Sequence, residues 1–322
     1  MRALPALRRD VITPDPRPRG ATRALERRLG DWARARLPGF AVDFAMFVLK
    51  QGWACLFGAL MLAAILLSHW LWQPGWALAR YDALFLFAII VQVLFLTLRL
   101  ESWAEVRVIA LFHLTGTAME IFKVGAGSWA YPEPGFFKLM GVPLFSGFMY
   151  ASVGSFMARV IRIFDMRFTP YPPFWLTVGL AVAIYVNFFA HHFLPDIRWG
   201  LFLATVLIYG RTRIWFRLSR WYFMPLPLAA FLSSLFLWIA ENVGTMTGTW
   251  LYAGQARLDP VSFAKIGSWY LLLYVSFVTV TLASRRIIGS DQAPLQHDPD
   301  RGRADDQQSE EHARHDIDRA AL

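Results

Sequence analysis

The chain contains two stretches with nearly the same pattern, EIFKVGAGSWAY at residues 120–131 and ENVGTMTGTWLY at residues 241–252. Each begins with a glutamate inside an apolar run and continues through a glycine to a Trp-x-Tyr sequence. The offset of 121 residues between them also aligns Pro74 with Pro195 and Arg99 with Arg220. The sequence therefore indicates a tandem duplication with one glutamate motif in each half.

The composition around these motifs is that of a membrane protein. Of the 322 residues, 56% are hydrophobic and only 17% are charged, which is too apolar for an ordinary soluble domain of this length. Apolar segments that suggest helices crossing about 30 Å of hydrocarbon begin near Trp53, Tyr81, Glu105, Gly141, Phe174, Trp199, Pro225 and Gly267. We therefore expect an all-α polytopic membrane protein with eight transmembrane helices.

The offset divides these helices into two repeats of four. Because four is even, both repeats enter the membrane in the same direction, which makes them parallel repeats related by an axis along the membrane normal. The expected organisation is a cytoplasmic basic arm with an interfacial helix (1–43), repeat 1 (44–165), repeat 2 (166–290) and a disordered cytoplasmic tail (291–322).

The basic residues predict the orientation of the chain. The net charge is +9, and 26 of the 32 lysines and arginines lie in the two ends and in alternate loops. The positive-inside rule therefore places both termini in the cytoplasm, and the expected location is a bacterial inner membrane. This placement explains the positive net charge without a nucleic-acid partner, so membrane lipids are the expected partners.

The two glutamates are the main candidates for chemistry, because ionisable residues within membrane segments are expensive and usually functional. Lys123 follows Glu120 by one helical turn, whereas Glu241 has Asn242 as its neighbour. We therefore expect Glu120 to be ionised and Glu241 to be protonated, as general acid–base chemistry requires. The alternative is that each glutamate only fixes the loop that follows it.

Other residues near the motifs complete the candidate site. Aromatic side chains recur at fixed distances from the acids and are expected to wall a binding pocket: Trp129, Tyr131, Trp250, Tyr252 and Trp269. His113 lies seven residues before Glu120 on the same helical face and is a candidate proton partner.

Neither a metal nor a cofactor is predicted. His191 and His192 are adjacent near a helix end, but no spacing of histidines and carboxylates matches a known catalytic metal set. Phosphate-binding glycine loops and nucleophile elbows are also missing from the sequence. ATP-driven transport and serine or zinc peptidase chemistry are therefore not expected.

The two glutamate motifs and the VPLFSGFMY run that ends at Tyr150 resemble a bacterial integral-membrane family, domain of unknown function 817. The resemblance covers about Phe44 to Ile288 and implies a membrane protein without implying an activity. The motifs are also faintly similar to membrane-embedded carotenoid cyclases and hydratases, which place glutamate at a helix end. That similarity would imply proton donation to a polyene, although the proline that precedes the acids in those cyclases is replaced here by Met119 and Ala240.

Three functions remain open from the sequence. The first is acid–base chemistry on an isoprenoid or other lipidic substrate, the second is a proton-coupled carrier of a small or lipidic solute, and the third is a non-catalytic membrane scaffold. The sequence does not decide whether the chain is an enzyme, and it identifies neither the substrate nor the oligomeric state. A shared environment for Glu120 and Glu241 would favour the first two functions.

Overall fold

The computed structural model describes residues 32, 38–73, 75–191, 193–256 and 259–283 of the chain. Within these residues the protein is mostly helical: α2 (Gly39–Ala54), α3 (Leu56–Leu71), α4 (Arg80–Thr97), α5 (Trp103–Gly125), α6 (Phe145–Ile163), α7 (Phe174–Ala190), α8 (Arg198–Tyr209), α9 (Leu226–Met246) and α10 (Ala264–Ala283). The predicted interfacial helix and C-terminal tail lie outside the described residues.

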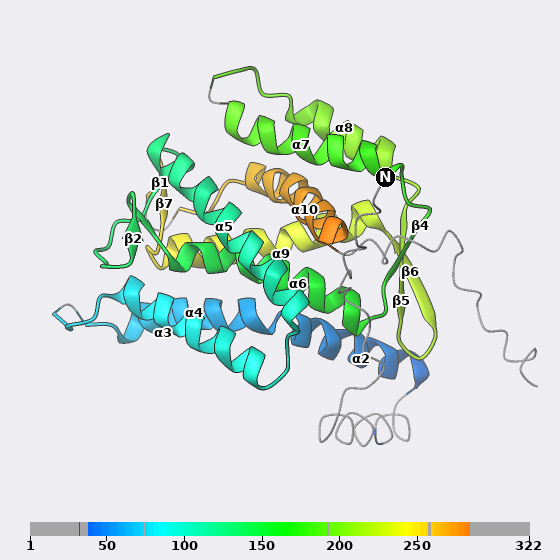
Figure 1. Ribbon diagram of the computed structural model, residues 1–322, viewed down its shortest axis with the longest axis horizontal. Coiled ribbons are helices and arrows are strands. Elements are labelled where there is room, and N and C mark those ends of the chain that lie inside the picture. The colour runs from blue at the N-terminus through cyan, green and yellow to red at the C-terminus, as the bar shows by residue number, and fades with distance from the viewer. Residues whose placement is uncertain (1–31, 33–37, 74, 192, 257–258, 284–322) are drawn as a thin grey trace, which may run out of the picture.

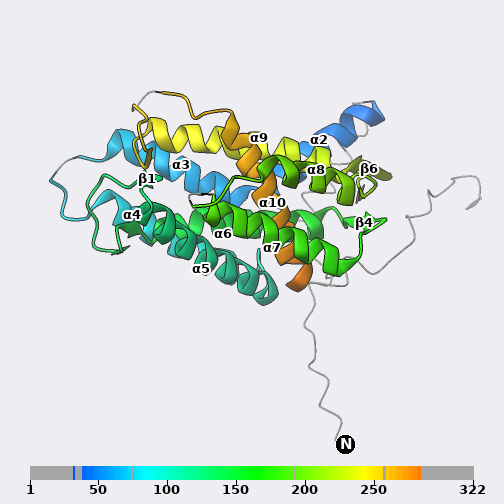
Figure 2. The same ribbon diagram turned by 90° about the horizontal axis from the view of Figure 1, so that it is seen from above.

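Short strands connect the helices. They are β1 (Trp129–Ala130), β2 (Lys138–Leu139), β3 (Val142–Pro143), β4 (Arg167–Thr169), β5 (Arg213–Arg217), β6 (Trp221–Pro225) and β7 (Leu251–Tyr252). β1 pairs with β7 and β2 with β3, while β4, β5 and β6 form one antiparallel sheet. These strands gather at two opposite ends of the molecule (Figures 1 and 2). We call the end with β1 and β7 the motif end and the end with β4–β6 the hairpin end.

The number of membrane spans differs from the prediction. A helix occupies each of the eight predicted positions, but only α4, α5, α9 and α10 are both long and apolar enough to cross a membrane. The bent pair α2 and α3, which meet at 66°, would make a fifth span. Helices α7 and α8 contain only 17 and 12 residues, and at about 1.5 Å per residue they fall short of the hydrocarbon thickness. By length and composition, the described residues therefore contain four or five candidate spans, and the count of eight is not confirmed.

Two apolar cores fill the molecule. One lies between α3, α4 and the start of α6 and includes the motif residues Tyr131 and Trp250. The other joins the end of α6 to α7, α8, α10 and strands β4 and β5. Because both cores reach α6, this helix connects the two halves of the described structure.

Helices α5 and α6 pack closely along their length because glycines line their contact. A Cβ atom at Gly154 would lie 2.8 Å from the Phe112 ring, and one at Gly116 would lie 2.5 Å from Tyr150 Cβ. Small residues of this kind let helix backbones approach each other within membranes. The close approach brings Tyr150 of α6 within reach of Glu120 on α5.

Candidate functional site

The two glutamate motifs end their helices in the same way. After α5, Gly127 has φ +69°, and the amides of Gly127 and Ser128 donate to the carbonyl oxygens of Val124 and Lys123 at 3.0 and 2.9 Å. After α9, Gly248 has φ +65°, and the equivalent amides of Gly248 and Thr249 donate over the same sequence separations, both at 2.9 Å. This is the Schellman arrangement, in which a glycine adopts the left-handed conformation that other residues avoid. Each glycine thereby turns the following Trp-x-Tyr sequence back towards its glutamate.

The two turned segments then pair with each other at the motif end (Figure 1). Strands β1 and β7 are antiparallel, with Trp129 opposite Tyr252 and Ala130 opposite Leu251. The rings of Trp129 and Tyr252 meet edge to face with their centroids 5.7 Å apart. Two motifs that are distant in sequence are therefore neighbours in space, because Trp129, which donates to Glu120, contacts Tyr252, which donates to Glu241.

Glu120 is 3% exposed and is surrounded by aromatic hydrogen-bond donors. Trp129 Nε1 and Tyr131 Oη donate to Glu120 Oε2 at 2.7 and 2.8 Å, and Tyr150 Oη is 2.6 Å from Glu120 Oε1. Burial of a carboxyl group is tolerated only when such bonds replace its hydration. These three contacts therefore stabilise the acid in the protein interior.

Glu241 has a related but different environment. Tyr252 Oη donates to Glu241 Oε2, just as Tyr131 donates to Glu120. Burial, followed by the nearby carboxyl groups, raises the pKa of both phenols well above the ordinary value, so both remain protonated donors. Glu241 differs from Glu120 in having a cation nearby. Lys265 Nζ lies 3.9 Å from the centroid of the Tyr252 ring, whose hydroxyl group donates to Glu241, and the charge of Lys265 acts on this glutamate.

The sequence suggested that Lys123 and Asn242 give the two glutamates different environments. The hydrogen bonds of these two side chains are instead with α7, with α9 and with the loop before α10. Lys123 Nζ donates to the Phe188 carbonyl oxygen on α7 at 2.7 Å and lies 4.1 Å from the centroid of the Phe188 ring. Asn242 Nδ2 donates to Trp238 O within α9, and Asn242 Oδ1 accepts from Val261 N at 2.9 Å. Asn242 therefore fastens the loop before α10, and the cation that acts on Glu241 is Lys265.

The remaining predicted aromatics surround the paired motifs. Trp250 packs against Gly244, where a Cβ atom would lie 1.9 Å from the indole ring. The Trp269 ring is 6.3 Å from the Tyr150 ring, so it contacts the Glu120 network through this tyrosine. His113 lies further along α5 against the Phe148 ring of α6, with centroids 4.5 Å apart. It faces α6, as Glu120 does, and lies beyond direct contact with the carboxyl group.

Sequence reasoning missed a group of polar residues that holds the motif end together. Arg80, at the start of α4, is 5% exposed, pairs with Glu133 and donates to Thr249 Oγ1 at 2.6 Å and to Ser68 Oγ at 3.0 Å. Next to it, Tyr81 Oη donates to Thr249 O at 2.6 Å. The consecutive Arg-Tyr-Asp sequence at residues 80–82 was the available signal, because its two charged residues begin an otherwise apolar helix.

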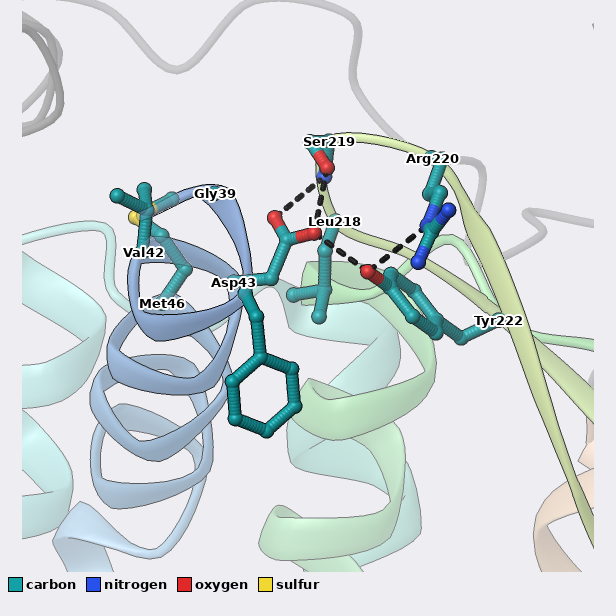
Figure 3. A pocket seen from close by; sticks show the side chains of 9 residues that line it. Gly39, Val42, Asp43, Met46, Leu218, Ser219, Arg220 and Tyr222 are labelled. Carbon is teal, nitrogen blue, oxygen red and sulfur yellow. Dashed lines mark hydrogen bonds between the residues drawn. The ribbon is translucent and has the colours of Figure 1, made fainter. Parts of the chain in front are cut away.

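A pocket of about 450 Å³ at the hairpin end is a second candidate site (Figure 3). It lies between the start of α2 and the turn before β6, and its main polar group is the Asp43 carboxylate. Figure 3 shows this group directed at Ser219 and Tyr222, and Ser219 Oγ donates to it at 2.7 Å. Since the carboxylate already joins α2 to the hairpin, the pocket is less suited to chemistry than the paired motifs.

Metal coordination finds no support in the described part of the chain, where no three His, Cys, Asp or Glu side chains are grouped to hold an ion. His192, one of the two histidines considered from the sequence, lies outside the described residues.

Comparison with known proteins identifies the family of the chain. Residues 43–277 match the family model described as "Protein of unknown function (DUF817)". The chain is also 42% identical over 233 residues to the uncharacterized protein YoaT of Bacillus subtilis (strain 168), which covers 72% of this chain and 88% of that protein. No solved structure matches the chain. The protein is therefore a member of the DUF817 family, whose sequence signature extends over both glutamate motifs.

Proposed function

We propose that the protein is a multi-pass inner-membrane protein in which the two glutamate motifs, derived from a tandem repeat, form one proton-exchanging site. The observation that carries this proposal is the pairing of β1 with β7, because it brings the environments of Glu120 and Glu241 together. Two neighbouring carboxyl groups do not readily ionise together, and this separates them into an acid and a base.

The neighbouring groups suggest which carboxyl group holds the proton. Lys265 favours an ionised Glu241, because its positive charge lies next to that side of the site. Glu120 can hold a proton without losing its partners, because a proton on Oε1 would reverse the bond that Tyr150 Oη donates to this oxygen, while Oε2 would still accept from Trp129 and Tyr131. This proposal reverses the roles inferred from the sequence, where Lys123 was expected to ionise Glu120.

The outer face of α9 favours a lipid-soluble substrate. Of the 18 residues that make α9 a candidate span, 17% are buried, compared with 39% in each of the other three candidate spans. Phe236, Ile239 and Met246 form the exposed face of this helix, whereas the half-buried Glu241 shares the opposite face with the buried Ser234 and Thr245. A substrate dissolved in the membrane would therefore pass beside α9 to reach Glu241. We propose acid–base catalysis on such a substrate, with Glu120 as the acid and Glu241 as the base.

The polyene chemistry suggested by the carotenoid enzymes is not part of this proposal. A carbocation would need the faces of the aromatic rings, but Lys265 Nζ lies over the Tyr252 ring and is 5.8 Å from the centroid of the Trp129 ring. A second positive charge beside this ammonium group would be repelled. Proton exchange with a polar group on a lipid is compatible with the same arrangement.

The proposal is tested by comparing the lipids of cells that express the wild-type chain, Glu241→Gln or Asp165→Asn. Asp165 is a matched control because its loss of charge is remote from the motifs and its φ of +49° suits asparagine. We expect one lipid product to be lost in Glu241→Gln and retained in Asp165→Asn. Identical lipid profiles in all three strains would refute catalysis. Proton-driven solute flux in proteoliposomes without any lipid conversion would also refute it and would indicate a carrier.

Infrared spectroscopy of the purified protein tests the protonation states separately. The proposal predicts one protonated carboxyl band at neutral pH that disappears in Glu120→Gln and persists in Asp165→Asn. Loss of the band in Glu241→Gln alone would instead assign the proton to Glu241, and the roles of acid and base would be reversed.

A further inference from the structure

Three buried polar side chains lie beside the Glu120 network without an obvious role. They are Ser146 and Thr117, which are 2% and 8% exposed, and the half-buried His113. Within the described residues, Ser146 Oγ, Thr117 Oγ1 and His113 Nδ1 have no hydrogen-bond partner. Buried polar atoms almost always have a partner, which is often an internal water molecule. Unpaired atoms of this kind on Thr117 and His113, both of which face Gly147, and on the adjacent Ser146 therefore indicate a small polar ligand.

Two of the three atoms face one point of the contact between α5 and α6. A Cβ atom at Gly147 would lie 2.3 Å from Thr117 Oγ1 and 2.6 Å from His113 Nδ1, so both atoms face the backbone of this glycine. Ser146 precedes Gly147, and its hydroxyl group lies next to the Tyr131 hydroxyl. The other neighbour of Tyr131 Oη is Glu120 Oε2 at 2.8 Å. Polar groups thus run from Glu120 through Tyr131 to Ser146, and Thr117 and His113 face the next residue of α6.

We propose that Ser146, Thr117 and His113 bind one internal water molecule and that this cluster returns protons to Glu120. Water fits the site because it donates and accepts hydrogen bonds, as two hydroxyl groups and an imidazole nitrogen require. The water-binding part stands on the three buried polar atoms alone. The proton-return part rests on the proposed function, in which Glu120 gives up a proton in each cycle.

Each step of the proposed transfer moves one proton from a donor to an acceptor. The last step follows the hydrogen bond that Tyr131 donates to Glu120. Tyr131 Oη gives its proton to Glu120 Oε2 and receives one from Ser146, which is resupplied through the water molecule. Rotation of the carboxylic acid about its Cγ–Cδ bond then places the protonated oxygen against Tyr150. Thr117 orients this water, and the proton comes from the imidazolium form of His113. At the end Glu120 is a neutral acid and His113 a neutral imidazole, while each hydroxyl group has gained one proton and lost one. No oxidant, metal or cofactor is needed.

Infrared difference spectra recorded in H₂¹⁶O and H₂¹⁸O test the water site directly. We expect the full-length protein in lipid nanodiscs to show an isotope-sensitive O–H band that is lost in Thr117→Val and Ser146→Ala. Thr115→Val is the matched control, because Thr115 is exposed on the same helix and its hydroxyl group donates to Leu111 O at 2.8 Å. Absence of the band from the wild type, or its persistence in Thr117→Val, would overturn the proposal.

Thermal unfolding of Thr117→Val is a second test, because the direction of the change in Tm distinguishes a bound water molecule from an unpaired hydroxyl group. Valine has nearly the shape of threonine, so Thr117→Val would raise the Tm if the hydroxyl group were simply unpaired. The proposal predicts a lower Tm, because the variant removes one partner from a satisfied network. An increase in Tm would count against the water site.

The proton-return part is measured by the rate at which the Glu120 carboxyl band shifts after transfer to D₂O. We expect slower exchange in Thr117→Val and His113→Phe than in Thr115→Val. Unchanged exchange in all three variants would refute the return pathway while the water site stood. A water band in a protein without any protonated carboxyl band would instead refute the proposed function, so the failures are distinguishable.

Discussion

Ala130 and Leu251 are paired directly across the β1–β7 ladder, and they are separated by the same 121 residues that relate the two glutamate motifs. An antiparallel pair of strands has a local two-fold axis at each paired position. An axis between Ala130 and Leu251 exchanges Trp129 with Trp250 and Tyr131 with Tyr252. The β1–β7 register is therefore symmetric with respect to the two motifs.

The two motifs differ in how tightly they pack, and this gives a first prediction. Gly244→Ala places a methyl group on the buried Trp250 ring, since a Cβ atom would lie 1.9 Å from it. We expect a loss of about 1–3 kcal/mol in the free energy of unfolding. Gly125→Ala is the control, because nothing lies within 4 Å of its Cβ position, and it should stabilise α5 by about 0.5–1 kcal/mol. Thermal unfolding in detergent measures both effects, and equal effects would contradict this packing.

The buried guanidinium group of Arg80 gives a second prediction. Arg80→Met removes the ion-pair partner of Glu133 and one of the partners of Thr249, and removal of one member of a buried ion pair typically costs about 3–5 kcal/mol. Because the Glu133 side chain is 28% exposed, we expect about 2–3 kcal/mol. Arg198→Met breaks a more exposed pair with Asp196 and should cost less than about 1 kcal/mol. Denaturant titration of both variants tests the ranking, and a larger loss in Arg198→Met would contradict it.

The sequence predicted the positions of the helices and located the two motifs that β1 and β7 bring together, because apolar segments and repeated patterns are local signals. It could not predict that Lys265 lies over the ring of Tyr252, the tyrosine that donates to Glu241, since this contact depends on how the loop after β7 folds. The hydrogen bond between Tyr150 and Glu120 could not be predicted either, because it depends on the close approach of α5 and α6. Lys123 was assigned from its spacing to Glu120 alone, and spacing does not show that the side chain extends towards Phe188 on α7.

The protonation of Glu120 gives a third prediction. Glutamine has the shape of a protonated glutamate, and its amide can donate to Tyr150 Oη while its oxygen accepts from Trp129 and Tyr131. Glu120→Gln should therefore change the free energy of unfolding by less than about 1 kcal/mol, whereas Glu120→Leu should cost about 2–4 kcal/mol by leaving buried donors unpaired. Chemical unfolding compares the two variants. A loss in Glu120→Gln as large as that in Glu120→Leu would indicate that the wild-type carboxyl group is ionised.

The orientation in the membrane gives the last prediction. Arg211, Arg213, Arg217 and Arg220 cluster at the hairpin end, and the positive-inside rule places such a cluster in the cytoplasm. In a Cys55→Ser background, Pro132→Cys at the motif end should react with an impermeant maleimide in intact cells. Arg211→Cys should react only after the cells are permeabilised, which also serves as the control for reactivity. The opposite pattern would place the glutamate site on the cytoplasmic side, where its protons would exchange with the cytoplasm.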